Sequence, residues 1–362
     1  MACVWKPNWN ETRQHFLDWW DHTGLLVGSW GAPPRVGPAH DPDAIQPPPP
    51  VSVEAGYTDV AQLVRRNHYR LSHGYFGADI LPVADTDIGP GSLALLLGSE
   101  PGFAPNTVWY EPAFRDHPNP EELPPLRFDP RNRWWQVHEQ TFRAQVALGR
   151  GKYFTGCPDL IENIDILSAL RDPQTLMMDM LERPAWVRRA VGEINQAFFE
   201  AYDRTYEIIK DDDGSVFGPF RIWGPGRTVK VQCDACAMFS PAMFRDFVQP
   251  ALTAQCDWLD HSLYHLDGTQ CICHLDALLE IEPLDAIEWT PQAGIEGGGH
   301  PRWFPLYKRI LDAGKSVQIM AGGVETIEPV FKAIGSRGVY LLCGFRSAAE
   351  VDDAARIADR WR

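Results

Sequence analysis

The C-terminal part of the chain repeats one pattern four times, and this repetition restricts the fold more than any other feature. Strand-like runs at 263–268, 286–294, 316–323 and 339–344 alternate with amphipathic segments at 273–281, 304–314, 324–338 and 347–361. Strands that alternate with helices predict a parallel sheet. At 362 residues, a (β/α)8 (TIM) barrel of the α/β class explains both the repetition and the length. A doubly wound open sheet is the alternative, although no strand precedes a Gly-x-Gly-x-x-Gly turn.

The first third of the chain is irregular. Stretches 31–50 and 103–126 are dense in proline, which lacks an amide donor and interrupts regular structure. Between them, 57–73 has helical periodicity and 75–83 resembles a buried strand that runs into a loop. We therefore expect a proline-rich covering segment over 1–56 and a barrel over 57–362.

Charge and composition exclude several classes of protein. The formal charge of −15, without a long basic run, disfavours a nucleic-acid partner. No apolar stretch reaches about 18 residues, and the N-terminus lacks the basic and apolar regions of a secretory signal, so we expect a cytoplasmic protein. Eight cysteines are too sparse for a disulfide scaffold, so they serve as core thiols, metal ligands or catalytic groups.

Reactive residue types gather where the predicted strands end. His265 and Asp267 end one strand, Glu288 and Trp289 the next, and Cys343 the last. In a (β/α)8 barrel the carboxyl ends of the strands surround the active site. Imidazole, carboxylate and thiolate are all zinc ligands. A zinc site at His265, Asp267 and Cys343 is one hypothesis, and a chance His-x-Asp beside a core thiol is the alternative.

Two other motifs resemble metal sites. The triplet His274-Leu275-Asp276 repeats the letters of 265–267, but an apolar stripe follows it, so its polar residues are predicted in the first turn of a helix. Cys233 and Cys236 have the spacing of a zinc knuckle. The pair Cys271-x-Cys273 is poorly spaced to complete a tetrahedral site.

Further polar residues are candidates for catalysis or binding. Asp79 lies inside an apolar strand, where burial would raise its pKa, or where it would cap the following turn. Gln232 and Asp234 are predicted at the opening of the barrel, and Arg221 and Arg346 near loop ends. These arginines would hold a ligand carboxylate or form ordinary ion pairs, and Trp289 would line the ligand site.

Several longer segments resemble the uroporphyrinogen decarboxylase superfamily, near its corrinoid-linked methyltransferases. They are "YHLDG…CHLDALLEIEPLDAIEWTPQAG", "WFPLYKRILDAGKSVQI", "LIENIDILSALRDPQTLMMDMLERPAWVRRAV" and "CDACAMFSPAMFRDFVQPAL". The resemblance covers roughly residues 57–362 and implies a (β/α)8 barrel. In the methyltransferases it implies zinc held by His-x-Cys and a later cysteine. This chain matches that pattern at His265 and Cys343 and has Asp267 in place of the first cysteine.

The resemblance and the departures from it leave three functions open. The first is methyl transfer to or from a corrinoid protein, with zinc activating a thiol or similar nucleophile; Glu288, from its place at a strand end, is a candidate catalytic residue. The second is metal-independent decarboxylation of a porphyrinogen-like or aromatic carboxylate, with Asp79 as the catalytic aspartate, although the arginine-rich N-terminal signature of the decarboxylases is missing. The third is a non-catalytic tetrapyrrole or corrinoid binder.

Overall fold

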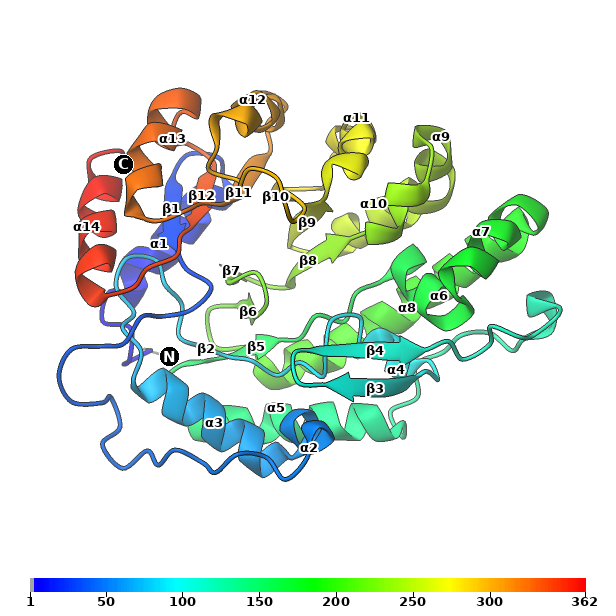
Figure 1. Ribbon diagram of the computed structural model, residues 1–362, viewed down its shortest axis with the longest axis horizontal. Helices are drawn as coiled ribbons and strands as arrows, with labels where there is room; N and C mark the ends of the chain where they lie inside the picture. The colour runs from blue at the N-terminus through cyan, green and yellow to red at the C-terminus, as the bar shows by residue number, and fades with distance from the viewer. Residues whose placement is uncertain (1–2) are drawn as a thin grey trace.

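A six-stranded parallel sheet forms the centre of the computed structural model, which describes residues 3–362 (Figure 1). Its strand order is β1-β12-β11-β10-β9-β8, and each neighbouring pair is parallel. The bounds are β1 Leu25–Gly28, β8 Thr228–Gln232, β9 His261–Asp267, β10 Ala286–Thr290, β11 Ser316–Met320 and β12 Val339–Leu342. The last four of these confirm the strands predicted from the repeated pattern.

A second sheet has the strand order β2-β5-β6-β7, with the last pair antiparallel. Its strands are short: β2 Val83–Ala84, β5 Phe154–Cys157, β6 Ser215–Phe217 and β7 Ile222–Gly224. Strands β3 Glu100–Ala104 and β4 Thr107–Glu111 form a separate hairpin. Because the short strands form no ladder with β1 or β8, the sheets of the described residues do not join into one closed cylinder. The structure confirms a parallel α/β architecture and does not show the predicted closed barrel.

Helices lie on both sides of the strands, α10 to α13 along one side and α3 and α5 along the other (Figure 1). Segments α12, α13 and α14 confirm three of the predicted helices. In residues 3–362, no helix combines the length and the apolar character that crossing a membrane requires. The helices are α1 Trp9–Trp20, α2 Val53–Thr58, α3 Val60–Ser72, α4 Leu93–Leu96, α5 Arg133–Gly149, α6 Asn163–Arg171, α7 Pro173–Glu182, α8 Pro184–Ile209, α9 Pro241–Met243, α10 Gln249–Trp258, α11 Leu275–Leu279, α12 Phe304–Asp312, α13 Ile327–Ile334 and α14 Ala348–Asp359.

Helix α1 covers the amino ends of the central strands. The indole of Trp19 donates a hydrogen bond to the carbonyl of Gly338, just before β12. The Trp19 carbonyl accepts one from Ser316, the first residue of β11. Both α1 and β1 lie within the segment 1–56, which was predicted to be irregular and of which residues 1–2 lie outside the described part. The carboxyl ends of the strands therefore form the opposite, separate side of the sheet.

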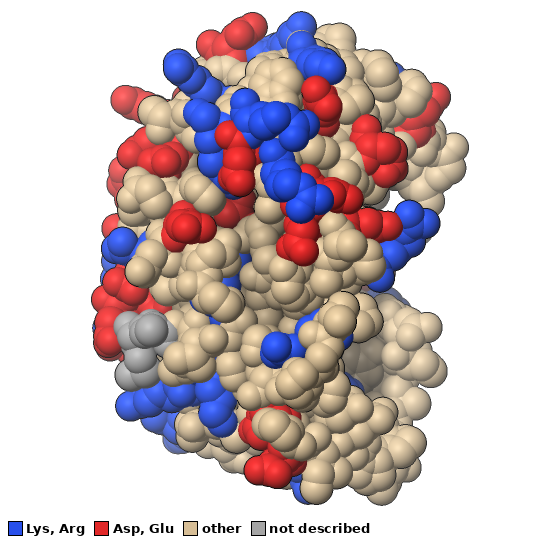
Figure 2. All heavy atoms as spheres, turned by 90° about the vertical axis from the view of Figure 1, so that its left-hand side faces the viewer, with Lys and Arg blue, Asp and Glu red and all other residues tan. Residues whose placement is uncertain are grey.

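Charged side chains of both signs share the molecular surface. On the face shown in Figure 2, Lys and Arg side chains are interspersed with Asp and Glu instead of forming one continuous basic area. The phosphate backbone of a nucleic-acid duplex would be repelled by the acidic side chains of this face as well as attracted by the basic ones.

Candidate functional site at the carboxyl ends of β8 and β9

Asp234, His265 and Asp267 form a group with the geometry of a metal site. Each offers one ligand atom, and these atoms lie within 4.8 Å of one another. His265 and Asp267 come from the end of β9, and Asp234 begins the 3-10 helix η2 (Asp234–Met238) after β8. The two strands are parallel neighbours, with Gln232 in register with His265, so their ends deliver these side chains to one place. Asp234 is exposed and the other two are half-buried, so the group is open to solvent.

The imidazole of His265 is oriented by Glu288 on the neighbouring strand. The Nδ1 atom of His265 lies 2.5 Å from Oε2 of Glu288, and Oε1 of Glu288 accepts a hydrogen bond of 2.8 Å from Thr290. Burial lowers the pKa of His265, but the charge of Glu288 and its hydrogen bond outweigh burial and raise it overall. A carboxylate at Nδ1 requires the proton there, which leaves Nε2 to face a metal or a substrate.

Asp234 is held in place by residues of β8 and α6. The carboxylate of Asp165, in the first turn of α6, accepts hydrogen bonds from the backbone amides of Asp234 (2.8 Å) and Ala235 (2.9 Å). The side-chain amide of Gln232 donates to Asp234 (2.9 Å) and to Asp165 (3.0 Å). Although Asp234 reaches the solvent, desolvation of its carboxylate by the surrounding protein and the negative charge of Asp165 raise its pKa to about 6. Gln232, predicted to bind substrate, thus has its amide group engaged within the protein.

Cys343 is not part of this group. It follows β12, its backbone amide donates to the carbonyl of Gly28 at 2.9 Å, and only 1% of the residue is exposed. Burial raises the pKa of its thiol, which disfavours the thiolate that metals bind. Among residues 3–362, Cys343 joins no cluster of potential ligands, and Asp234 accompanies His265 and Asp267 instead. The predicted combination of His265, Asp267 and Cys343 is not assembled.

Two further candidates, Trp289 and Arg346, lie in other surroundings. Trp289 is fully buried, with its ring centroid 5.0 Å from that of Trp303, because it points to the opposite side of the sheet from Glu288. Arg346 is exposed and pairs with Glu350 at 2.7 Å. Neither contacts the ligand group.

Arg221 lies deeper in the protein. Its guanidinium donates to Asp85 at 2.7 Å and to the carbonyl of Trp30 at 2.8 Å. The side chain is 11% exposed, and these contacts engage two of its five N–H donors within the protein. Its role in binding a ligand carboxylate stays a prediction.

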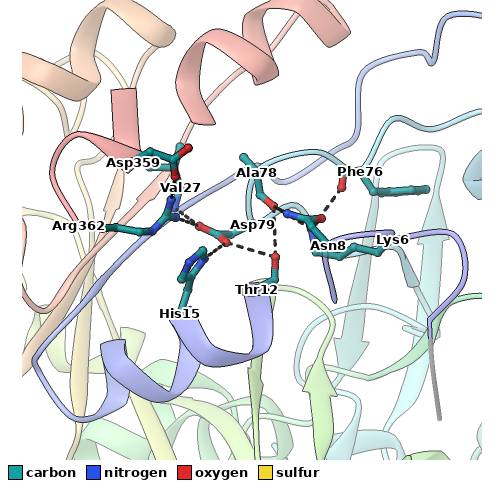
Figure 3. Close-up of polar contacts among 10 residues, drawn as sticks. All are labelled: Lys6, Asn8, Thr12, His15, Val27, Phe76, Ala78, Asp79, Asp359 and Arg362. Atoms are coloured by element: carbon teal, nitrogen blue, oxygen red, sulfur yellow. Dashed lines mark hydrogen bonds and ion pairs between the residues drawn. The ribbon is translucent and has the colours of Figure 1, made fainter. Parts of the chain in front are cut away.

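Asp79 belongs to a different polar cluster, which joins α1 to the end of the chain (Figure 3). It is fully buried, and its carboxylate accepts hydrogen bonds from the amide of Val27 (2.9 Å) and the hydroxyl of Thr12 (3.3 Å). It also lies 2.7 Å from Nδ1 of His15 and 2.9 Å from the guanidinium of Arg362. These contacts place it between α1 and β1, and it does not belong to the ligand group.

The pKa of Asp79 differs from the prediction. Burial alone raises the pKa of this carboxyl, as the sequence analysis expected. The hydrogen bond with His15 and the positive charge of Arg362 outweigh burial, so the pKa is lowered overall. A fully bonded, ionised aspartate fits a structural anchor.

Sequence reasoning missed four acids and a lysine beside the site. Asp85 and Asp87 follow β2, and Asp159 and Glu162 follow β5. Lys230 of β8 pairs with Asp159 at 2.8 Å, and the amide of Asp159 donates to Asp87. The sequence feature that could have identified Asp85 and Asp87 is an acidic residue directly after a predicted strand. It is visible in "VADTD" at 83–87.

Two of these acids have a pKa above the ordinary range of a carboxyl group. Burial raises the pKa of Asp87 to about 8 and that of Glu162 to about 8. Glu162 is fully buried, and one of its oxygens accepts a hydrogen bond of 2.8 Å from the amide of Gln232. The carboxyl ends of β2, β5 and β8 therefore hold proton donors next to an ion pair.

The remaining motifs have structural roles. His274 directly precedes α11, stacks on Phe244 with centroids 4.6 Å apart, and lies 2.9 Å from the Cys236 carbonyl. Asp276 is in the first turn of α11, as predicted. Cys233 and Cys236 join no group of three potential ligands in the described part of the chain.

A cavity of about 310 Å³ lies elsewhere, near the start of β5 and the end of α8. Cys3, Tyr153, Lys210 and Asp211 are among its lining residues, and none of the metal-ligand group lines it. Its size does not make it the site of chemistry, because it lacks the converging ligand atoms found at β8 and β9.

Comparison with known proteins finds similarity among solved structures. No protein-family model and no curated protein matches the chain. Among solved structures, the chain is similar to a methyltransferase from Methanosarcina mazei, with a TM-score of 0.60 at 13% sequence identity. The match covers 96% of this chain and 98% of that one. At this identity the similarity shows that the two chains share a fold over nearly their whole length.

Proposed function

We propose that the protein is a metal-dependent methyltransferase of the uroporphyrinogen decarboxylase superfamily, with its active site at Asp234, His265 and Asp267. The observation that carries this proposal is the convergence of three ligand atoms within 4.8 Å at the carboxyl ends of β8 and β9. The full-length similarity to a methyltransferase fold supports it. We further propose that the second sheet completes a (β/α)8 barrel with the central sheet, although no strand ladder joins them in the described residues, and that the protein is cytoplasmic.

The residues present fit a divalent ion such as zinc. Two carboxylates and one imidazole are suitable donors, and three protein ligands leave a position for substrate. A bound ion would act as a Lewis acid that lowers the pKa of a thiol, hydroxyl or water nucleophile.

The chain's own residues would prepare the site for this chemistry. Glu288 holds the proton on Nδ1 of His265 and so directs Nε2 outward. Asp165 fixes the backbone on which Asp234 lies. The acids near β2 and β5 would exchange protons with a bound substrate. We propose a corrinoid carried by a partner protein as the methyl carrier.

The proposal is tested with free methylcobalamin as the methyl donor and a panel of small thiols and phenols as acceptors. We expect cleavage of the methyl–cobalt bond, followed by absorbance, that depends on added zinc and falls by more than about a hundredfold in His265→Ala. Turnover that is unaffected by both chelator and His265→Ala would contradict it.

Decarboxylation is the second candidate, because Asp87 and Glu162 are buried acids that hold protons at neutral pH. Such groups suit proton delivery to a carbanion formed when carbon dioxide leaves. This reaction would be insensitive to chelators and would fail in Asp87→Asn. Tight corrinoid binding without turnover on any methyl donor or carboxylate would instead support a non-catalytic binder.

A further inference from the structure

We propose that the metal shell of this protein contains no sulfur: Asp234, His265 and Asp267 hold a first-row divalent ion through two oxygens and one nitrogen. This inference rests on the proposed function for the purpose of the ion, but its ligands follow from geometry alone. It departs from the shell that the sequence resemblance implies, in which two cysteines accompany the histidine.

Two of the three donors, His265 and Asp234, are already oriented before an ion binds. Nδ1 of His265 is held by Glu288, whose carboxylate also accepts a hydrogen bond from Thr290, so Nε2 is the ring nitrogen left to bind an ion. Asp234 is fixed by hydrogen bonds from its own amide to Asp165 and from Gln232 to its carboxylate. Supporting partners of this kind set ligand direction and strengthen metal binding.

No cysteine of the described residues joins the ligand group. Close thiol neighbours and burial raise the pKa of the Cys236 and Cys271 thiols, and burial raises the pKa of the Cys233 thiol, which disfavours the thiolate that metals bind. All three residues are buried, and Cys343 is buried beside β1 and β12. Cys273 is exposed, and its thiol donates to the carbonyl of Gln270 at 3.1 Å. None of these sulfur atoms belongs to the ligand group found in residues 3–362.

The donor types determine which ions are favoured. Carboxylate and imidazole ligands suit zinc, cobalt, iron and manganese, whereas thiolates favour softer ions such as cadmium. The two carboxylates also balance the double positive charge of the ion. We therefore expect zinc to bind at least as tightly as cadmium.

The test uses the full-length protein, stripped with chelator and loaded with cobalt(II), whose near-ultraviolet absorption contains an intense charge-transfer band only when sulfur is a ligand. We expect one cobalt per chain without this band. Asp234→Asn should weaken cobalt binding by more than about tenfold. Cys343→Ser should change neither the affinity nor the spectrum.

Asp267→Cys is the positive control, because it places sulfur in the shell. It should create the band and shift the preference toward cadmium. A sulfur band in the unmodified protein that disappears in Cys343→Ser, or no cobalt binding at all, would overturn the inference. If cobalt binds without sulfur but no methyl group is transferred, the inference stands and the proposed function fails. If methyl transfer proceeds and the unmodified protein shows the sulfur band, the proposed function stands and the inference of a sulfur-free shell fails.

Discussion

His265 and Glu288 lie directly opposite each other on the parallel strands β9 and β10, and Nδ1 of the imidazole is 2.5 Å from Oε2 of the carboxylate. Side chains in register on neighbouring strands point to the same side of the sheet. Glu288 is fully buried, whereas the His265 side chain is 13% exposed. The pair therefore connects the interior of the sheet to the ligand group at its edge.

Glu288→Gln is expected to weaken metal binding by about 10- to 100-fold, because a neutral amide no longer fixes the tautomer or increases the basicity of His265. Titration of the stripped protein with zinc measures this. Glu350→Gln, which changes an exposed partner of Arg346, is the matched control and should leave affinity unchanged. Equal affinities for Glu288→Gln and the unmodified protein would show that Glu288 does not position the imidazole.

Asp165→Asn is expected to reduce zinc affinity by roughly tenfold, since its carboxylate holds the amides of Asp234 and Ala235 and an asparagine accepts these bonds less strongly. The same titration measures the change. Asp246→Asn is a suitable control because Asp246 forms an exposed ion pair with Arg188. If both variants bind zinc alike, Asp234 does not depend on α6 for its position.

Asp79→Asn is expected to lower the free energy of unfolding by about 3 kcal/mol, the usual cost of removing one partner from a buried, hydrogen-bonded charge cluster. Denaturant unfolding measures this. Asp359→Asn removes the other carboxylate that pairs with Arg362, and because Asp359 is 69% exposed the cost should stay below about 1 kcal/mol. Zinc affinity should be the same in both variants. Unchanged stability together with lost turnover in Asp79→Asn would instead identify Asp79 as a catalytic residue.

Glu162→Gln is expected to change how stability depends on pH. The pKa of Glu162 is raised by burial from 4.5 to about 8, so the folded state binds the proton more tightly than the unfolded state. Its contribution is fully present below about pH 4.5 and is lost as pH rises toward 8, by at most about 1.4 kcal/mol per pH unit. The Glu162→Gln variant has no proton to lose at this position, so it lacks this pH-dependent loss of stability. Between pH 5 and pH 8 the melting temperature of the unmodified protein should therefore fall relative to that of Glu162→Gln. If the melting temperatures of the two proteins change with pH in parallel, the raised pKa of Glu162 is contradicted.

Local patterns were sufficient to predict much of the fold. The strands at β9 to β12 and the helices α12 to α14 carry strong periodicity, and the structure confirms them. Strand β2 has only two residues, which is too short for a periodic signal, and of the strand predicted at 75–83 only Val83 lies in β2. Helix α1 and strand β1 were missed because the proline-dense stretch that follows them dominated the interpretation of 1–56.

The ligand group was predicted in part. His265 and Asp267 are two positions apart on one strand, so their proximity follows from the sequence. Asp234 was recognised as a polar residue at the opening, but its distance from His265 depends on the pairing of β8 with β9. Cys343 ends a neighbouring strand too, yet its thiol is buried, and nothing in "LLCG" indicates to which side that sulfur points.

The most direct measurement uses the His265→Ala and Asp79→Asn proteins after incubation with zinc. It compares their bound zinc and their methyl transfer from methylcobalamin, each at a temperature where the folded state is fully populated. The account predicts that His265→Ala loses both bound zinc and transfer, whereas Asp79→Asn keeps both. Retained transfer in His265→Ala, or its loss in a folded, zinc-containing Asp79→Asn protein, would contradict it.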